Sequence, residues 1–330
     1  MGRSGRSTGP RAKYRESAGE LPTIHSMNIV IATAEPLGAY HLVPLYPAMG
    51  AATLAGHSFT HLIPYPEKVQ GEPWRSTSAD LSVLEAADLV VLTGGGYTAW
   101  TELLARECVR IGVRFVITEL AYGAQSDGQE HPRPMALSAM SPAGAANLSR
   151  YHNWNQGDIV ITGTPLLDDL PVWQPVVDRV LLLSSVESDT RDPDGVLKKI
   201  AGDLVAAGKH VVVRCHPRED RSIWDGFELD TSTTPARAAS NAEIVIGYPG
   251  SAHPIAAAIG VPVVAVAPTA ALRDALPTEQ ASVIPTWITD LSQVELLSHA
   301  VPTSASVLYA TNGPSGNSGE RVVEFWLGQL

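Results

Sequence analysis

The sequence predicts an α/β protein with two doubly wound parallel-sheet domains of the Rossmann type that face a central cleft. Two observations carry this prediction. Short apolar runs alternate with longer helical stretches from Met27 onward, and the alternation begins again with the apolar run at 179–185. Such alternation is typical of βαβ units, because parallel strands need a crossover helix between them. The 330 residues are enough for two domains of ordinary size.

The first half opens with a strand expected at 27–34 and a helix at 41–56. Gly56 closes that helix in the position expected after a C-cap. Further strands are expected at 58–65, 88–96, 113–119, 136–140 and 157–163, and further helices at 80–86, 97–111 and 142–151.

The second half repeats the pattern after a stretch rich in Pro and turn residues at 165–175. Strands are expected at 179–185, 209–217, 243–250 and 261–268, and helices at 193–207, 234–241, 252–259 and from about 318. We therefore expect a disordered extension at 1–26, a first domain at 27–170 and a second at 171–330. The last helix is expected to pack back on the first domain. Asp168 and Asp169, at the boundary, are interpreted as hinge or capping residues.

Charge and cysteine content exclude several classes of protein. The net charge of -11 argues against general nucleic-acid binding, which usually needs a basic face. Cys108 and Cys215 each lie inside an expected element, which indicates a reducing, cytoplasmic compartment and offers no zinc spacing. No apolar run reaches the roughly 18–20 residues that cross a bilayer. Peripheral membrane association through the basic segment 1–26 stays open, as does the oligomeric state.

The strongest local signal is the segment EIVIGYPGSAHPIAAAIGVPVVAVAP at 243–268. A strand leads into a Gly/Pro turn containing Tyr248 and Gly250, and a helix begins between Ser251 and His253. Free amide groups and the positive end of the dipole make a helix N-terminus a natural phosphate site. Gly250 permits close backbone approach, and the hydroxyl of Ser251 can bond a phosphate oxygen. A turn of this kind also occurs in doubly wound folds without any ligand, so both interpretations stay open.

This segment resembles the donor-site element of GT-B glycosyltransferases and of the related non-hydrolysing UDP-N-acetylglucosamine 2-epimerases. Three other segments are similar in order and spacing: the glycine loop, helix and strand at 38–62, IVITGTPLLDDL at 159–170, and VVVRCHPRED at 211–220. The resemblance implies a GT-B-like fold with an N-terminal acceptor domain and a C-terminal nucleotide-donor domain. The donor would be a small-molecule nucleotide-activated sugar that serves as substrate, with no cofactor.

One position departs from that family pattern. Most GT-B transferases carry a Glu five residues before the Gly of Gly-x-Pro, where it holds the ribose hydroxyls. Counting back from Gly260 places Ile255 there. Ribose recognition must therefore come from elsewhere, or the ligand is not a standard nucleotide sugar.

The resemblance also implies roles for side chains at strand ends. His41 follows the first strand, where inverting enzymes often carry a base that deprotonates the acceptor hydroxyl; the alternative is an exposed loop histidine. His216 and Arg218 are expected to bind phosphate, since Arg pairs with it in a bidentate manner. Ser184 is expected to touch the donor phosphates, or else to be part of an ordinary turn. Glu219 is expected to face solvent.

The remaining candidates concern the acceptor and the cofactor class. Gly38, Gly95, Glu119 and Tyr122 are the expected acceptor-side residues. The glycine turn at 93–97 is not G-x-G-x-x-G, which argues against a nicotinamide enzyme. No D-x-D stands in a plausible loop of the first domain, so no metal is implied.

Three functions follow from this reading. The leading one is a metal-independent glycosyltransferase with an unknown donor and acceptor. The second is a nucleotide-sugar 2-epimerase or hydrolase, which would need several acids near the sugar. The third is a non-catalytic partner protein on the same scaffold, supported by Ile255.

Overall fold

The structure is a computed structural model, and it describes most of the chain from Ser26 onward. The described residues are 26–33, 42–63, 77–78, 80–93, 99–120, 131–184, 195–216, 219–250, 252–267, 286–288, 307, 311 and 316–329.

The first domain contains a seven-stranded parallel sheet in the order β3-β2-β1-β4-β5-β6-β7. Its strands are β1 (Asn28–Thr33), β2 (Ser58–Leu62), β3 (Thr77–Ser78), β4 (Leu89–Thr93), β5 (Phe115–Thr118), β6 (Leu137–Ala139) and β7 (Val160–Ile161). The chain moves outward from β1 to β3 and then crosses back to β4. This reversal is the order of a doubly wound fold.

The second domain repeats this order in a six-stranded parallel sheet, β10-β9-β8-β11-β12-β13. Its strands are β8 (Arg179–Leu183), β9 (His210–Arg214), β10 (Glu228–Leu229), β11 (Ile244–Gly247), β12 (Val263–Val266) and β13 (Thr286–Ile288). Here the reversal falls between β8 and β11. The predicted fold class, two doubly wound parallel-sheet domains, is confirmed.

Helices cover the sheets, and several connections are single 3-10 turns. The α-helices are α2 (Tyr46–Leu54), α3 (Ala99–Ile111), α4 (Pro142–His152), α6 (Val196–Ala206), α7 (Pro235–Ser240), α8 (Ala252–Ile259) and α12 (Ser318–Leu327). The 3-10 turns are η1 (Val43–Leu45), η3 (Leu81–Leu84), η4 (Gln156–Asp158), η5 (Pro165–Leu167) and η6 (Arg221–Trp224).

Three expected elements differ in form from the prediction. The helix expected at 41–56 is a 3-10 turn followed by α2, because Pro44 and Pro47 each stand in the first turn of a segment, where proline needs no hydrogen-bond donor. The helix expected at 80–86 is only η3, which Asp80 caps by accepting from the N–H of Ser82 at 2.9 Å. The strand expected at 157–163 is shortened to β7 because 156–158 form η4.

Strand periodicity divides the core of the first domain into two layers. Val30 and Ala32 face one layer with α3 and α4, and Ile29 and Ile31 face the other with α2 and α12. Successive strand side chains point to opposite faces, so a strand buried on both sides becomes a continuous apolar run.

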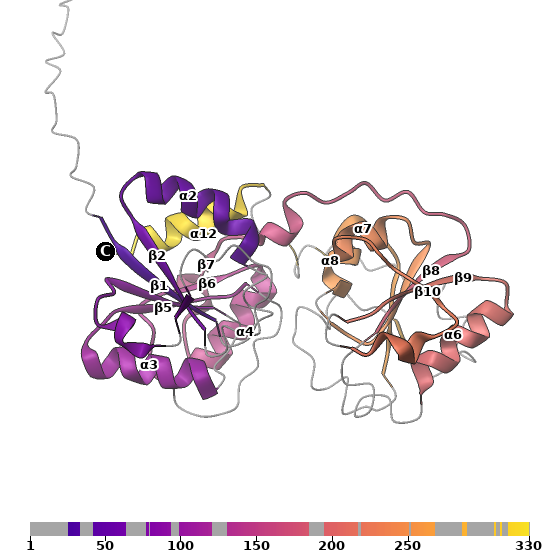
Figure 1. Ribbon diagram of the computed structural model, residues 1–330, viewed down its shortest axis with the longest axis horizontal. Helices are drawn as coiled ribbons and strands as arrows, with labels where there is room; N and C mark the ends of the chain where they lie inside the picture. Colours follow the sequence, from indigo (N-terminus) through magenta and orange to yellow (C-terminus); the bar gives the residue numbers. More distant parts are fainter. Residues whose placement is uncertain are drawn as a thin grey trace, which may run out of the picture.

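The C-terminal helix α12 belongs to the packing of the first domain, although it follows the second domain in sequence. Figure 1 shows it beside α2 on the first lobe. Trp326 is fully buried there, and its indole N–H donates to the hydroxyl of Thr118 at 2.8 Å. Burying a tryptophan contributes about 3–5 kcal/mol when judged by truncation to Ala. The chain therefore crosses from the first domain to the second and returns.

A close strand contact explains one glycine of the second sheet. A Cβ atom at Gly247 would lie 2.3 Å from the carbonyl oxygen of Leu183, its partner on β8. Any larger residue would force β8 and β11 apart at the point where the strand order reverses. Gly247 thus allows the close approach of β8 and β11 immediately before the segment 248–250.

Candidate functional site

Three of the predicted donor segments meet at one edge of the second sheet. Ser184 follows β8, His216 lies just after β9, and the turn 248–250 follows β11. These strands are neighbours in the order β9-β8-β11, and all are parallel. Their carboxyl ends therefore share one edge, at the reversal point where doubly wound sheets bind ligands.

A hydrogen-bond network joins the first two of these segments. The Ser184 hydroxyl donates to Oε2 of Glu219, and the backbone N–H of His216 donates to the same oxygen at 3.3 Å. The indole N–H of buried Trp224 lies 3.2 Å from the Ser184 hydroxyl and 3.3 Å from Oε1 of Glu219. The expectation that Glu219 faces solvent was wrong, since its carboxylate accepts hydrogen bonds from three residues. Trp224 was the available signal in the sequence, because the indole N–H of a buried tryptophan needs a hydrogen-bond acceptor.

A partly buried ion pair joins the end of β9 to the residue after β10. Arg214 of β9 binds Asp230, whose side chain is only 2% exposed, and donates to the carbonyl of Ser232 at 3.0 Å. The positive charge of Arg214 is therefore paired with Asp230.

The pKa of the Cys215 thiol responds to the charges at the carboxyl end of β9. Burial raises the pKa of its thiol, the Glu219 carboxylate raises it further, and Arg221 acts in the opposite direction. Cys215 is thus a protonated thiol next to a negatively charged group. Neither cysteine forms a disulfide.

The turn after β11 leads into α8. Among the described residues, a Cβ atom at Gly250 would find only the Tyr248 carbonyl, at 3.9 Å, so their packing does not require glycine there. These residues leave the backbone at Gly250 open to a ligand, and α8 begins two residues later at Ala252.

Two donor candidates of this turn lie deeper than expected. His253 is fully buried, its Nε2 lies 3.4 Å from the carbonyl of Val264, and burial lowers its pKa to about 4. A neutral imidazole facing β12 brings no positive charge to a phosphate. Tyr248 is 4% exposed and belongs to the core cluster that also contains Trp224. Neither of these buried side chains is therefore placed to make the phosphate contact expected of it.

Ile255, which stands where the family pattern has a ribose-binding Glu, is also buried. Ile255 is 4% exposed on α8. An apolar residue is thus used here for packing, and this side chain cannot hold a ribose as the family's Glu would.

On the acceptor side, Glu119 follows β5 and is completely buried. Its Oε2 accepts from the N–H of Met140 at 3.0 Å, and a Cβ atom at Gly144 would meet the same oxygen at 2.0 Å. The carboxylate therefore sits against the first turn of α4, where the helix dipole favours a negative charge. This burial does not favour the acceptor contact that the sequence suggested for Glu119.

A row of hydroxyl groups crosses the first sheet at its carboxyl edge, and sequence reasoning missed it. Thr33, Thr93 and Thr118 stand opposite one another on β1, β4 and β5. The Thr33 hydroxyl lies 2.9 Å from Nε2 of His61, and the Ser138 hydroxyl donates to Thr118 at 3.1 Å. The signal was a polar residue near the end of each apolar run.

Six predicted site residues lie outside the described residues. They are Gly38, His41, Gly95, Tyr122, Arg218 and Ser251. Their roles remain predictions.

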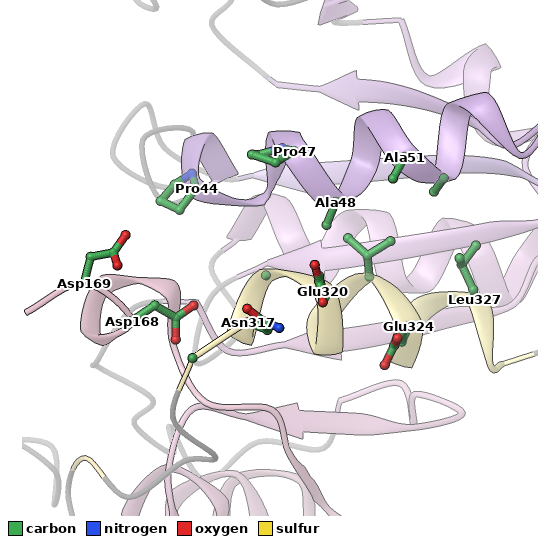
Figure 2. Close-up of a pocket in the computed structure, with 14 residues that line it drawn as sticks. Pro44, Pro47, Ala48, Ala51, Asp168, Asp169, Asn317, Glu320, Glu324 and Leu327 are labelled. Carbon is green, nitrogen blue, oxygen red and sulfur yellow. The ribbon is translucent and has the colours of Figure 1, made fainter.

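A separate groove of about 550 Å³ lies between α2 and α12, beside η5 (Figure 2). Pro44 of η1 and the proline and alanines of α2 line it from one helix, and Val323 and Leu327 line it from α12. Its acids are Asp168, Asp169, Glu320 and Glu324. Its described lining contains no Lys, Arg or His, so the groove does not suit an anionic nucleotide.

Among the described residues, no three His, Cys, Asp or Glu side chains gather as a metal site would require. In the same part of the chain, no helix is both long and apolar enough to cross a membrane.

Comparison by sequence found nothing: no family model and no curated protein matches this chain. Comparison by structure found similar folds. A UDP-GlcNAc 2-epimerase from Methanocaldococcus jannaschii, in complex with UDP-GlcNAc and UDP, has a TM-score of 0.61 at 14% identity and covers 91% of this chain and 99% of its own. The calicheamicin glycosyltransferase CalG4 has a TM-score of 0.59 at 14% identity, covering 92% and 99%.

The wall teichoic acid polymerase TagF is also similar, with a TM-score of 0.56 at 11% identity, covering 93% of this chain and 89% of its own. These neighbours include transferases and epimerases, and at such low identity they share the fold and not a demonstrated activity. The chain therefore has the GT-B fold, which glycosyltransferases and nucleotide-sugar 2-epimerases have in common.

Proposed function

We propose that this protein is a metal-independent glycosyltransferase that moves a sugar, or a similar group, from a nucleotide-activated donor to an acceptor. The observation that carries the proposal is the meeting of Ser184, His216 and the open turn at Gly250 on three neighbouring strand ends of the second sheet. Hydroxyl and amide donors beside the N-terminus of α8 suit a diphosphate.

In this proposal the donor diphosphate lies against Gly250, Ser251 and the N-terminus of α8, with His216 and Arg218 beside it. His41 of the first domain takes the proton of the acceptor hydroxyl. The acceptor oxygen then forms a bond to the anomeric carbon while the bond from that carbon to the phosphate oxygen breaks. The electron pair stays on the leaving diphosphate, which the helix dipole and the basic side chains stabilise. No resident cofactor takes part.

The second candidate is a nucleotide-sugar 2-epimerase or hydrolase. The similarity to the M. jannaschii epimerase favours it, together with the acid Glu119 at a strand end of the first domain. Its weakness is that Glu119 is fully buried against α4, whereas elimination and proton return need acids that reach the sugar.

The experiment incubates the purified chain with UDP-, GDP-, CDP- and dTDP-sugars and a pool of acceptors, in D₂O, and analyses the products by mass spectrometry. Transfer is expected with one donor class and should be lost in His41→Ala. Deuterium at C2 of the recovered nucleotide sugar would show an epimerase. No chemical change in any donor would contradict both catalytic candidates and favour a non-catalytic partner protein.

A further inference from the structure

The Glu219 carboxylate stands where the proposed donor site needs an anion. Two of its hydrogen-bond donors, the Ser184 hydroxyl and the His216 backbone N–H, belong to the residues assigned to the donor phosphates. The third, the indole N–H of Trp224, is buried and fixed by the core. Three donors, from the residue after β8, the segment after β9 and η6, therefore converge on the Glu219 carboxylate.

These donors have no second hydrogen to offer. The Ser184 hydroxyl carries one hydrogen and directs it to Glu219, while the backbone N–H of Ser184 donates to the carbonyl of Arg214 at 3.1 Å. The single N–H of His216 is likewise used. An incoming phosphate oxygen can gain these hydrogen bonds only if the carboxylate gives them up.

Charge adds to this competition. Arg214, the cation of β9, is bound to Asp230 and so does not neutralise Glu219. The field of Glu219 also acts on the neighbouring Cys215 thiol, whose pKa it raises. A phosphate and a carboxylate on the same donors would repel each other strongly, because two like charges disfavour sharing one site.

We infer that Glu219 is a specificity-determining residue of the donor site, whose carboxylate occupies the phosphate position of the unliganded protein and must be displaced by the diphosphate of the donor. The inference rests on the proposed function, because it uses the same site. A monoanion that only takes over the hydrogen bonds of the Glu219 carboxylate gains little binding free energy. A diphosphate that also reaches the turn at Gly250 and the N-terminus of α8 makes additional contacts and can displace it.

The test measures pyrophosphate binding by isothermal titration calorimetry in phosphate-free buffer. Glu219→Gln keeps the size of the side chain and removes its charge, and we expect it to bind pyrophosphate at least tenfold more tightly than the wild type. Glu228→Gln is the matched control, because Glu228 is an exposed acid of the same domain that pairs with His210. It should bind as the wild type does. Adding Ser184→Ala to Glu219→Gln should remove part of the gain.

Several results would overturn the inference. Equal or weaker binding by Glu219→Gln would mean that Glu219 braces the His216 segment instead of competing with the ligand. Absence of pyrophosphate binding in every variant would mean that no anion site exists for Glu219 to occupy. If Glu219→Gln lacks the folded circular-dichroism spectrum, Glu219→Asn carries the same prediction.

A second titration with UDP, CDP, GDP and dTDP separates this inference from the proposed function. Tighter pyrophosphate binding by Glu219→Gln, without binding of any nucleotide, would support the inference and contradict the proposed function. A nucleotide that binds the wild type and Glu219→Gln equally well would support the function and contradict the inference.

Discussion

Asp168 accepts two hydrogen bonds from Ser318, a residue 150 positions further along the chain. Its Oδ2 receives the backbone N–H at 2.8 Å, and its Oδ1 receives the hydroxyl at 2.7 Å. Asn317, the N-cap residue of α12, provides no side-chain cap. Asp168 of the interdomain connection therefore caps the helix that returns to the first domain, so the connection and the return are fixed at the same place.

Replacing Asp168 with Ala should destabilise α12. Loss of an N-terminal cap typically costs about 1–2 kcal/mol. Hydrogen exchange followed by mass spectrometry should show faster exchange in 318–327. Asp169→Ala is the matched control, because Asp169 is exposed and should change stability by less than about 0.5 kcal/mol. Equal effects of the two substitutions would show that the contact with Ser318 has no energetic role.

Asp230→Asn should weaken the second domain. Arg214 would keep its hydrogen bond to Ser232 but lose its charged partner, leaving a guanidinium that is only 23% exposed without compensation. We expect a loss of about 2–3 kcal/mol, since breaking a fully buried pair costs about 3–5 kcal/mol. Urea unfolding measures it. Glu228→Gln, which breaks a solvent-exposed pair with His210, should cost less than about 1 kcal/mol. A loss below that of the control would refute the prediction.

Acidification should destabilise the protein partly through His253. Burial lowers its pKa from 6.5 to about 4, so the unfolded chain binds a proton over this range while the folded chain does not. The contribution of the neutral His253 to the free energy of unfolding is complete above pH 6.5. It is lost as the pH falls toward 4, by on the order of 3 kcal/mol. His253→Leu should flatten this decline in urea unfolding at pH 7.5, 5.5 and 4.5, relative to His210→Gln, which changes an exposed histidine. His61 and His152, whose burial also lowers their pKa to about 4, contribute to the remaining slope. An unchanged slope in His253→Leu would contradict the prediction.

The Cys215 thiol should become more reactive in Glu219→Gln. Removing the carboxylate removes one of the causes that raise the pKa of this thiol, so more thiolate forms at a given pH. We expect several-fold faster alkylation by iodoacetamide at pH 8. Cys108 gives no background, because it is fully buried and its pKa is raised to about 12. A slower reaction in the variant would mean that Glu219 does not set the local field.

The sequence was sufficient for the fold because its apolar runs alternate with helix signals twice, and residues such as Val30 and Val212 lie in strands buried on both sides. Three of the four edge strands, β3, β10 and β13, were missed. β3 and β10 have only two residues each and β13 has three, so their pattern shows no period. Pro44 and Pro47 were visible, yet their division of one helix into η1 and α2 depends on local hydrogen bonds that composition does not reveal.

The sequence predicted which strand ends form the candidate site. It predicted the direction of the individual side chains less well. Ser184, His216 and Gly250 were placed together because parallel strands bring their carboxyl ends to one edge. Which way a side chain turns depends on packing, so His253 and Tyr248 proved to be core residues. Glu219 was misjudged because its partner Ser184 is 35 residues away.

The central claim is that the second domain binds a nucleotide-activated donor at the edge that carries His216. Isothermal titration calorimetry with UDP, GDP, CDP and dTDP tests it most directly, comparing the wild type, His216→Ala and the control His210→Ala, an exposed histidine at the opposite end of β9. We expect one nucleotide to bind the wild type and His210→Ala with equal affinity, and to bind His216→Ala at least tenfold more weakly. Binding of no nucleotide, or equal binding by all three proteins, would contradict the claim.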